Sequence, residues 1–316
     1  MQIITNANQF VSDRRSVVTI GKFDGIHRGH QELIKKMVSL AAEMNAVSVV
    51  FVINTSPQQL LSKEERRQML AGMGVDVLLE TMLDGAMITT KAEDFITGTL
   101  VGSLHAAGVV VGEDYHFGYE RQGNVAMLQD KGREYDFKVF VLKYVSDGER
   151  ISSSMIREKL AKGLVEEVNG LLGYDFYVTG EIIHGRQLGR TIGIPTANLI
   201  TDQSKLLPPY GVYYTRSVIS GNTCCGITNI GTKPTVDGQF TGVETYFFDC
   251  GEELYGEDLR VSLLHFARPE TRFADIEALK AQIDRDKTDA RAYFGLAEDP
   301  AARRHGFFKH SSGKHH

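Results

Sequence analysis

Cysteine is scarce in this chain: its 316 residues include three cysteines, and two of them, Cys224 and Cys225, are adjacent. No Cys-x-x-Cys pair and no spaced, even-numbered set of cysteines is present, which excludes a disulfide-stapled scaffold. We therefore expect a protein without a disulfide framework, in a reducing cytoplasm.

Other features are missing as well. No apolar run approaches the ~20 residues that a membrane-spanning helix needs, and residues 1–16 lack the basic-then-apolar layout of a secretion signal. Positive charge is not in excess, since the net charge is -5 and the isoelectric point is about 6.1. We therefore expect no nucleic-acid or membrane partner, and any phosphate must be bound by local positive groups and backbone amides.

The length predicts two domains of ~100–200 residues each. In the first half, strands alternate with helices, which predicts crossover connections and a parallel sheet with ligands at the carboxyl ends of its strands. The predicted strands are 16–21, 46–53, 75–80 and 107–112, and the predicted helices are 31–44, 62–74 and 92–104. The first helix has one apolar face, made of Leu33, Ile34, Met37, Leu40, Ala41 and Met44.

From Tyr174 onward the pattern changes to short strands rich in β-branched and aromatic residues, which predicts a small antiparallel barrel. These strands are 174–185, 211–220, 223–231, 242–249 and 258–267. Residues 273–294 predict one amphipathic helix with Ile276, Leu279, Ile283 and Tyr293 facing inward. We expect domains at 1–172 and 173–297, followed by a disordered tail at 298–316.

The segment GKFDGIHRGHQELI (21–34) carries the first chemical signal. Its glycine-bearing loop, with Gly21 and Gly25, leaves a strand and enters a helix, an arrangement that aims backbone N–H groups at an anion. His27 and His30 stand at the helix start, where a cationic side chain opposes the helix dipole but is favourable beside a phosphate. The alternative is a pair of surface histidines next to an ordinary turn.

A second signal is ISSSMIREKL (151–160). Ser152, Ser153 and Ser154 are natural N-caps, and Arg157 falls in what we expect to be the first helical turn. A cation there is explained if it holds a phosphate. The alternative is that Arg157 pairs with a carboxylate.

A third segment, VGEDYHFGYERQGN (111–124), follows a predicted buried strand. It interleaves Gly112 with Asp114, Tyr115 and Phe117, a composition that suits a loop binding a base or ring. It suits a plain surface loop equally well.

In the second half, HGRQLGRTIGIPTANL (184–199) is glycine-rich and basic, so its backbone amides can approach phosphates. Thr196 and Asn198 offer hard oxygen donors that suit Mg²⁺. Glu244 lies on a predicted strand and could accept a hydroxyl proton beside such a site. The alternatives are a turn-rich hairpin and a solvated carboxylate. The further candidates in this run are Gly185, Gly189, Arg190, Gly193 and Pro195.

Taken in order, GKFDGIHRGH, VGEDYHFG, ISSSMIR, HGRQLGRTIGIPTANL, TNIGTKPTV and VETYFFD resemble the prokaryotic bifunctional riboflavin kinase/FAD synthetase family over about residues 15–295. The resemblance implies a Rossmann-like nucleotidylyltransferase domain followed by a six-stranded Greek-key barrel with a flanking helix. It implies phosphorylation of riboflavin to FMN by the second domain and adenylylation of FMN to FAD by the first. The implied substrates are ATP, riboflavin and FMN, with Mg²⁺ as the metal.

Residue by residue, the resemblance implies that His27 and His30 bind ATP phosphates and that Arg157, with Ser153 and Ser154, forms a second phosphate site. It places Gly21, Phe23 and Asp24 in the first loop and Asp114 beside the nucleotide. In the barrel it implies that Thr196 and Asn198 hold Mg²⁺ and ATP, and that Glu244 is the catalytic base.

Two departures fall in the first domain. VVFVINTSPQQL (49–60) lacks a Phe-x-Pro-His-Pro-like segment, and Tyr115 and His116 replace Phe and Arg. The hypotheses are therefore a bifunctional enzyme, a riboflavin kinase with an altered or regulatory first domain, and a flavin-binding sensor without turnover. Intact His27, His30, Arg157, Thr196, Asn198 and Glu244 favour an enzyme.

Overall fold

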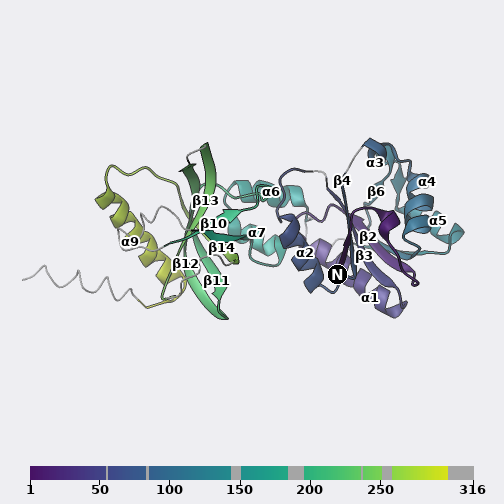
Figure 1. Ribbon diagram of the computed structural model, residues 1–316, viewed down its shortest axis with the longest axis horizontal. Coiled ribbons are helices and arrows are strands. Elements are labelled where there is room, and N and C mark those ends of the chain that lie inside the picture. The colour runs from purple at the N-terminus through teal and green to yellow at the C-terminus, as the bar shows by residue number, and fades with distance from the viewer. Residues whose placement is uncertain are drawn as a thin grey trace, which may run out of the picture. The chain divides into compact units, whose positions relative to one another are not determined.

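The computed structural model describes residues 1–54, 56–82, 85–143, 151–183, 196–235, 238–250 and 258–297. The chain divides into two compact units, whose elements are labelled in Figure 1. Unit 1 comprises Met1–Glu158, Gly170–Gly173 and Gln203–Leu206, and unit 2 comprises Lys159–Asn169, Tyr174–Asp202 and Leu207–His316.

Unit 1 is built on a six-stranded parallel sheet in the order β1-β4-β3-β2-β5-β8. Its centre confirms the prediction, because the buried runs of Val and Ile form strands covered on both faces. Thus Val18 and Val49 belong to one apolar cluster, while Val17 and Val50, which alternate with them, are also fully buried. The strands are β1 Gln2–Ile4, β2 Ser16–Gly21, β3 Val47–Asn54, β4 Val77–Met82, β5 Ala106–Gly112 and β8 Lys138–Leu142.

The helices of this half also follow the periodicity. Helix α1 (Arg28–Glu43) contacts β2, β3 and β5 and buries Ile34, Met37, Leu40 and Ala41, as its apolar face predicts. The predicted helix 92–104 is α4 (Ala92–Asp94) continued by a π-helix, η2 (Phe95–Ser103). The remaining elements are η1 Ala7–Gln9, α2 Lys63–Gly72, α3 Gly85–Thr89, β6 His116–Phe117, η3 Tyr119–Arg121, β7 Gly123–Asn124 and α5 Val125–Glu134. Helices α6 (Ser153–Ala161) and α7 (Val165–Leu172) follow in sequence, and their residues within Lys159–Asn169 belong to unit 2.

A short piece of the second half of the sequence is part of unit 1. Within Gln203–Leu206, Lys205 pairs by backbone with Gln59, and its Nζ lies 2.7 Å from the Leu60 carbonyl oxygen and 2.6 Å from Glu65 Oε2. The Lys205 and Glu65 side chains are 1% and 2% exposed. Removing one partner of such a buried pair leaves an uncompensated charge, so this contact fixes Gln203–Leu206 in unit 1.

Unit 2 is a closed antiparallel barrel in the order β10-β13-β12-β11-β14-β9. Three hydroxyls cross its interior, with Thr228 Oγ1 2.9 Å from Thr215 and 2.8 Å from Thr245, and all three residues are fully buried. The sequence pattern missed β10 because Asn198 and its neighbours follow a glycine-rich run. The strands are β9 Tyr177–Ile183, β10 Ala197–Thr201, β11 Gly211–Ile219, β12 Asn222–Thr235, β13 Gly238–Phe247 and β14 Asp258–Pro269.

Helix α9 (Ile276–Tyr293) lies against this barrel (Figure 1). Ile283 and Ala290 pack with Val212, Tyr214 and Ile227 of the barrel strands. The prediction that Ile276 faces inward is wrong, since it is 59% exposed. Tyr293 is 49% exposed, but its ring lies 5.2 Å from that of Tyr214 and 5.5 Å from that of His265 in the barrel.

Instead, α9 buries two charged residues, Asp286 and Arg291. Asp286 accepts hydrogen bonds from Arg268 Nε at 2.9 Å and Nη2 at 2.7 Å. An apolar-face prediction cannot find inward charges that are paired in this way.

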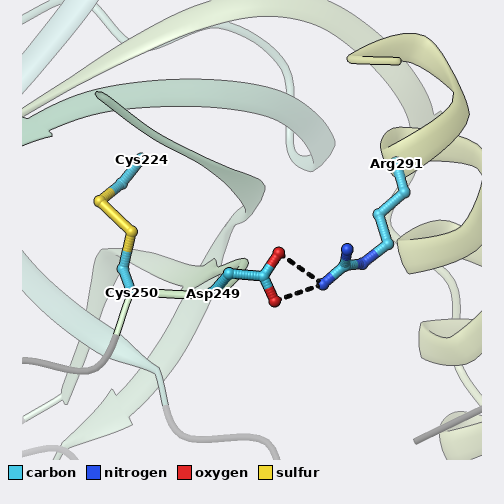
Figure 2. The surroundings of a disulfide bond; sticks show 4 residues. All are labelled: Cys224, Asp249, Cys250 and Arg291. Carbon is cyan, nitrogen blue, oxygen red and sulfur yellow. Dashed lines mark hydrogen bonds and ion pairs between the residues drawn. A yellow bond between two sulfur atoms is a disulfide. The ribbon is translucent and has the colours of Figure 1, made fainter. Parts of the chain in front are cut away.

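One disulfide contradicts the expectation drawn from cysteine scarcity. Cys224 of β12 is bonded to Cys250, which follows β13, across a sequence separation of 26, and Cys225 is a free thiol. Figure 2 shows the neighbouring Asp249 directed at Arg291 of α9, with Nη2 2.8 Å from Asp249 Oδ1. The disulfide at Cys250 therefore ties the segment after β13 to β12, and the ion pair of the adjacent Asp249 ties the same segment to α9.

Among the described residues, no helix has both the length and the apolar character needed to cross a membrane.

Candidate functional site

The first candidate site begins where β2 and β5 end. The two strands are neighbours in register, with Thr19 beside Val110, so Gly21 and Gly112 end them at the same edge of the sheet. The loop after β2 turns sharply into α1, with left-handed φ angles at Phe23 (46°), Gly25 (83°) and Ile26 (37°). A Cβ at Gly25 would lie 2.8 Å from Leu60 Cδ1, so both the backbone angle and the available space require glycine there.

The two histidines of the loop lie face to face. His27 is the N-cap of α1, and its Nδ1 accepts the His30 backbone N–H at 3.4 Å. The two rings stack with centroids 3.7 Å apart, and Phe23 lies 5.1 Å from the His30 ring. The alternative of two surface histidines is wrong, because His27 is 5% exposed and the His30 Nδ1 is buried.

Burial explains why a histidine pair is tolerated at a helix start. The pKa of His30 lies well below its ordinary value, mainly because the ring is buried and to a smaller extent because His27 is next to it. His30 is therefore neutral near pH 7 and does not oppose the helix dipole. Its Nδ1 makes no hydrogen bond in the described part of the chain, so a polar ring atom at the start of α1 is left without a partner.

Ser153 and Arg157 of α6 reach the same loop, and Ser152 caps that helix. The Met155 N–H lies 3.3 Å from Ser152 Oγ, the expected N-cap contact, and Ser153 Oγ donates to the Asp24 carbonyl oxygen at 2.7 Å. Arg157 is the fifth residue of α6, beyond the first turn where we expected it, because the helix begins at Ser153 rather than later.

Arg157 is paired with a carboxylate, the alternative that the sequence left open. Its Nε and Nη2 donate to Asp24 Oδ2 at 2.9 and 2.6 Å, and Nη2 also donates to the Gln58 carbonyl oxygen at 2.5 Å. Its Nη1 has no hydrogen-bond partner among the described residues. Ser154, the other residue proposed here, is exposed on the helix.

The loop after β5 contributes less than its composition suggests. Phe117 belongs to the apolar core, 7% exposed and 5.7 Å from the Phe95 ring, so the structure corrects the expectation that it contacts a nucleotide or flavin. Tyr115 stacks on Phe117 at 5.6 Å, and burial raises the pKa of its hydroxyl. Asp114 is half-buried beside the end of β5, and its carbonyl oxygen lies 2.7 Å from His116 Nδ1.

The second candidate site lies on three neighbouring barrel strands. Strand register sets Asn198 of β10 directly opposite Glu244 of β13, and Glu244 directly opposite Asn229 of β12. Directly opposed residues share a face with Cβ atoms ~4.5–5.5 Å apart. Two of the predicted residues are therefore brought together, and all three are half-buried.

Asn229 is a site residue that the sequence reasoning missed. It lies in the TNIG segment, which supported the resemblance but received no role. A polar residue at an alternate position of a strand is a weak signal, and only its pairing with Glu244 identifies it.

Thr196 precedes β10, and its carbonyl oxygen lies 3.4 Å from Asn198 Nδ2. Gly185, Gly189, Arg190, Gly193 and Pro195 lie outside the described residues. Within the described ranges, no group of three or more His, Cys, Asp or Glu side chains could hold a metal. Thr196 and Asn198 nevertheless offer hard oxygen donors, which fit Mg²⁺ that receives its other ligands from a triphosphate.

Family models divide the chain at the same place as the change in sequence pattern. A model described as FAD synthetase matches residues 9–155, and one described as riboflavin kinase matches residues 172–294.

Curated relatives match almost the full length. Proteins named bifunctional riboflavin kinase/FMN adenylyltransferase are 36% identical in Escherichia coli K12 (89% of this chain, 94% of the relative), 34% in Listeria monocytogenes (91% and 95%) and 34% in Haemophilus influenzae (93% and 99%). A solved structure described as a macrolide-efflux protein from Streptococcus pneumoniae is 31% identical, with a TM-score of 0.79 over 90% of this chain and 96% of that chain.

Proposed function

The chain belongs to the family of bifunctional riboflavin kinase/FMN adenylyltransferases, and we propose that the two clusters described above are the sites of its two reactions. It phosphorylates riboflavin with ATP and adenylylates FMN with ATP, the second reaction belonging to the part that matches FAD synthetase. The observation that carries the proposal is the paired placement of predicted residues, His27 on His30 and Asn198 opposite Glu244.

In the adenylylation site, an FMN phosphate oxygen attacks the α-phosphorus of ATP, and pyrophosphate leaves. The start of α1 offers backbone N–H groups and the positive end of a helix dipole to the triphosphate. His27 and His30, held at that start, donate hydrogen bonds to oxygens that gain charge in the transition state. Arg157 Nη1 supplies a cationic donor. No covalent enzyme intermediate is needed, because alignment and charge stabilisation suffice.

In the kinase site, Glu244 accepts the proton of the ribityl 5′-hydroxyl as that oxygen attacks the γ-phosphorus of ATP. Thr196 and Asn198 hold Mg²⁺, which neutralises charge on the phosphates when it is bound. Asn229 stands directly opposite Glu244 on the neighbouring strand, and we assign its amide the role of orienting the carboxylate.

The remaining sequence expectations are part of the same proposal. The catalytic domains span 1–172 and 173–297, the partners are small molecules rather than nucleic acid or membrane, and the enzyme works in the cytoplasm, where ATP is available. Gly112 and Asp114 border the nucleotide at the end of β5.

Single substitutions assayed for both reactions test the assignment. Glu244→Ala is expected to abolish FMN formation from riboflavin while FAD formation from added FMN continues. His30→Ala is expected to do the reverse, with flavins separated by chromatography. Loss of both activities in one variant would contradict separate sites, and full FAD synthesis by His30→Ala would refute the placement of the phosphates.

A further inference from the structure

Both carboxylate oxygens of Asp24 accept hydrogen bonds from other residues of the protein. Oδ1 accepts the Leu60 backbone N–H at 2.7 Å, and Oδ2 accepts Nε and Nη2 of Arg157 at 2.9 and 2.6 Å. The side chain is 12% exposed. A carboxylate used in this way has little capacity left for contact with a nucleotide.

These bonds join three segments that are distant in sequence. The Leu60 partner is 36 residues away and the Arg157 partner is 133 residues away. Ser153 adds a bond to the Asp24 backbone oxygen, and Arg157 adds one to Gln58. The loop after β2, the segment 58–60 and the start of α6 therefore meet at one carboxylate.

The backbone around Asp24 needs such an anchor. Phe23 and Ile26 are non-glycine residues with left-handed φ angles of 46° and 37° on either side of it. Backbone of this kind persists only where the surroundings over-determine it, and it gathers at functional sites. The strained turn ends at His27, and the buried Phe23 ring lies against His30.

We propose that Asp24 is a positioning residue of the adenylylation site, which holds the strained turn that places His27 and His30 and orients the Arg157 guanidinium. The proposal rests on the proposed location of that site. Asp24 binds the Nε and Nη2 edge of Arg157 and leaves Nη1 for a phosphate oxygen, so pairing with a carboxylate and binding of a phosphate are compatible.

The test compares Asp24→Ala and Asp24→Asn with Asp130→Asn, a matched loss of one carboxylate on the exposed face of α5. The kcat for FAD synthesis from FMN is expected to fall about 100-fold in Asp24→Ala, the effect of misplacing groups by ~1 Å. Asp24→Asn keeps an oxygen that can accept the Leu60 N–H but loses the negative charge, so its kcat for FAD synthesis is expected to fall about 10-fold. Because the positioned groups act mainly on charge that develops in the transition state, the loss is expected to fall chiefly on kcat, with a smaller rise in KM for ATP. Far-UV circular dichroism and urea unfolding of the same variants serve as the folding control for unit 1, and riboflavin phosphorylation by unit 2 is expected to be unchanged.

An unchanged kcat with a raised KM for ATP would overturn the proposal, since that split indicates direct nucleotide binding. Wild-type kinetics in both Asp24 variants would overturn it as well. If Asp24→Ala fails to fold, Asp24→Asn decides by the same criteria. Full FAD synthesis by both His30→Ala and Arg157→Ala would instead refute the location of the site, so the two failures are distinguishable.

Discussion

The bond between Cys224 and Cys250 lends itself to a quantitative test, because its neighbour Cys225 offers a matched control. Replacing Cys250 by serine removes the cross-link and changes one atom of the side chain. The link joins β12 to the residue after β13, with a sequence separation of 26. The next residue back, Asp249, holds the buried Arg291 of α9 (Figure 2).

The expected loss follows from the length of the closed loop. Opening a loop of 26 residues restores entropy to the unfolded chain equivalent to about 3.5 kcal/mol of stability at 25 °C. With a urea dependence of ~1–3 kcal/mol per molar, the unfolding midpoint of unit 2 is expected to fall by about 1.2–3.5 M. Cys225→Ser, which removes a half-buried free thiol from the adjacent position, is expected to change stability by less than about 1 kcal/mol.

The assay has two parts. Alkylation in denaturant without reductant, followed by mass spectrometry, is expected to label one cysteine of the wild-type chain, and all three after reduction. Urea unfolding, followed through riboflavin phosphorylation so that unit 2 is reported, is then compared for Cys250→Ser, Cys225→Ser and the wild type with and without reductant.

Two results would refute the reasoning. Labelling of all three cysteines without reductant would mean that the bond does not form in solution. An equal loss of stability in Cys225→Ser and Cys250→Ser would mean that packing of the thiols, rather than closure of the loop, is responsible.

Three further predictions concern unit 1. Because burial lowers the pKa of His30 in the folded state, the unfolded chain binds a proton first as the pH falls, so the free energy of unfolding is expected to decrease below pH ~6.5 and to level off below the folded pKa. Between these limits the change of unfolding free energy with pH, measured by urea unfolding, is expected to be smaller in His30→Ala. An unchanged pH dependence in that variant would contradict the burial argument. Lys205→Met leaves the buried Glu65 carboxylate without its cationic partner and is expected to destabilise unit 1 by about 3–5 kcal/mol. Adding Glu65→Gln to the same chain is expected to restore part of that stability. Losses that simply add up in chemical denaturation would show that the two side chains are not coupled. Gly25→Ala places a Cβ 2.8 Å from Leu60 Cδ1 on a residue with a left-handed backbone. FAD synthesis is therefore expected to fall while riboflavin phosphorylation continues. A wild-type rate of FAD synthesis would contradict the tight turn.

Much of the fold could be predicted from local pattern. The run 16–21 is β2 without change of bounds, and four of the six apolar positions predicted in 31–44, namely Ile34, Met37, Leu40 and Ala41, form the buried face of α1. The missed elements lack that pattern: β1 has three residues, and β8, at the edge of the sheet, has no fully buried residue. Edge strands bury too little apolar surface to show in composition.

The sequence pattern could predict the positions of some candidate site residues but not of others. Asn198 and Glu244 are brought together by strand pairing alone, so recognising the strands nearly suffices to place them. Phe117 was misjudged because an aromatic residue beside glycine has the same appearance in a core as in a binding loop. The Cys224–Cys250 bond was excluded on the count of cysteines, although a single bond needs only two that meet.

The two sites are therefore built in different ways, and this difference predicts how they respond to change. The proposed kinase residues Asn198, Asn229 and Glu244 stand on strands whose register is fixed by many backbone bonds, so their placement does not depend on one side chain. The proposed adenylylation residues His27 and His30 lie at the start of α1, after a loop whose left-handed backbone is held by one carboxylate, one arginine and one serine from distant positions. Substitutions outside the reacting groups should consequently damage FAD synthesis far more often than riboflavin phosphorylation, because misplacing aligned groups by ~1 Å is enough to cost ~100-fold in rate.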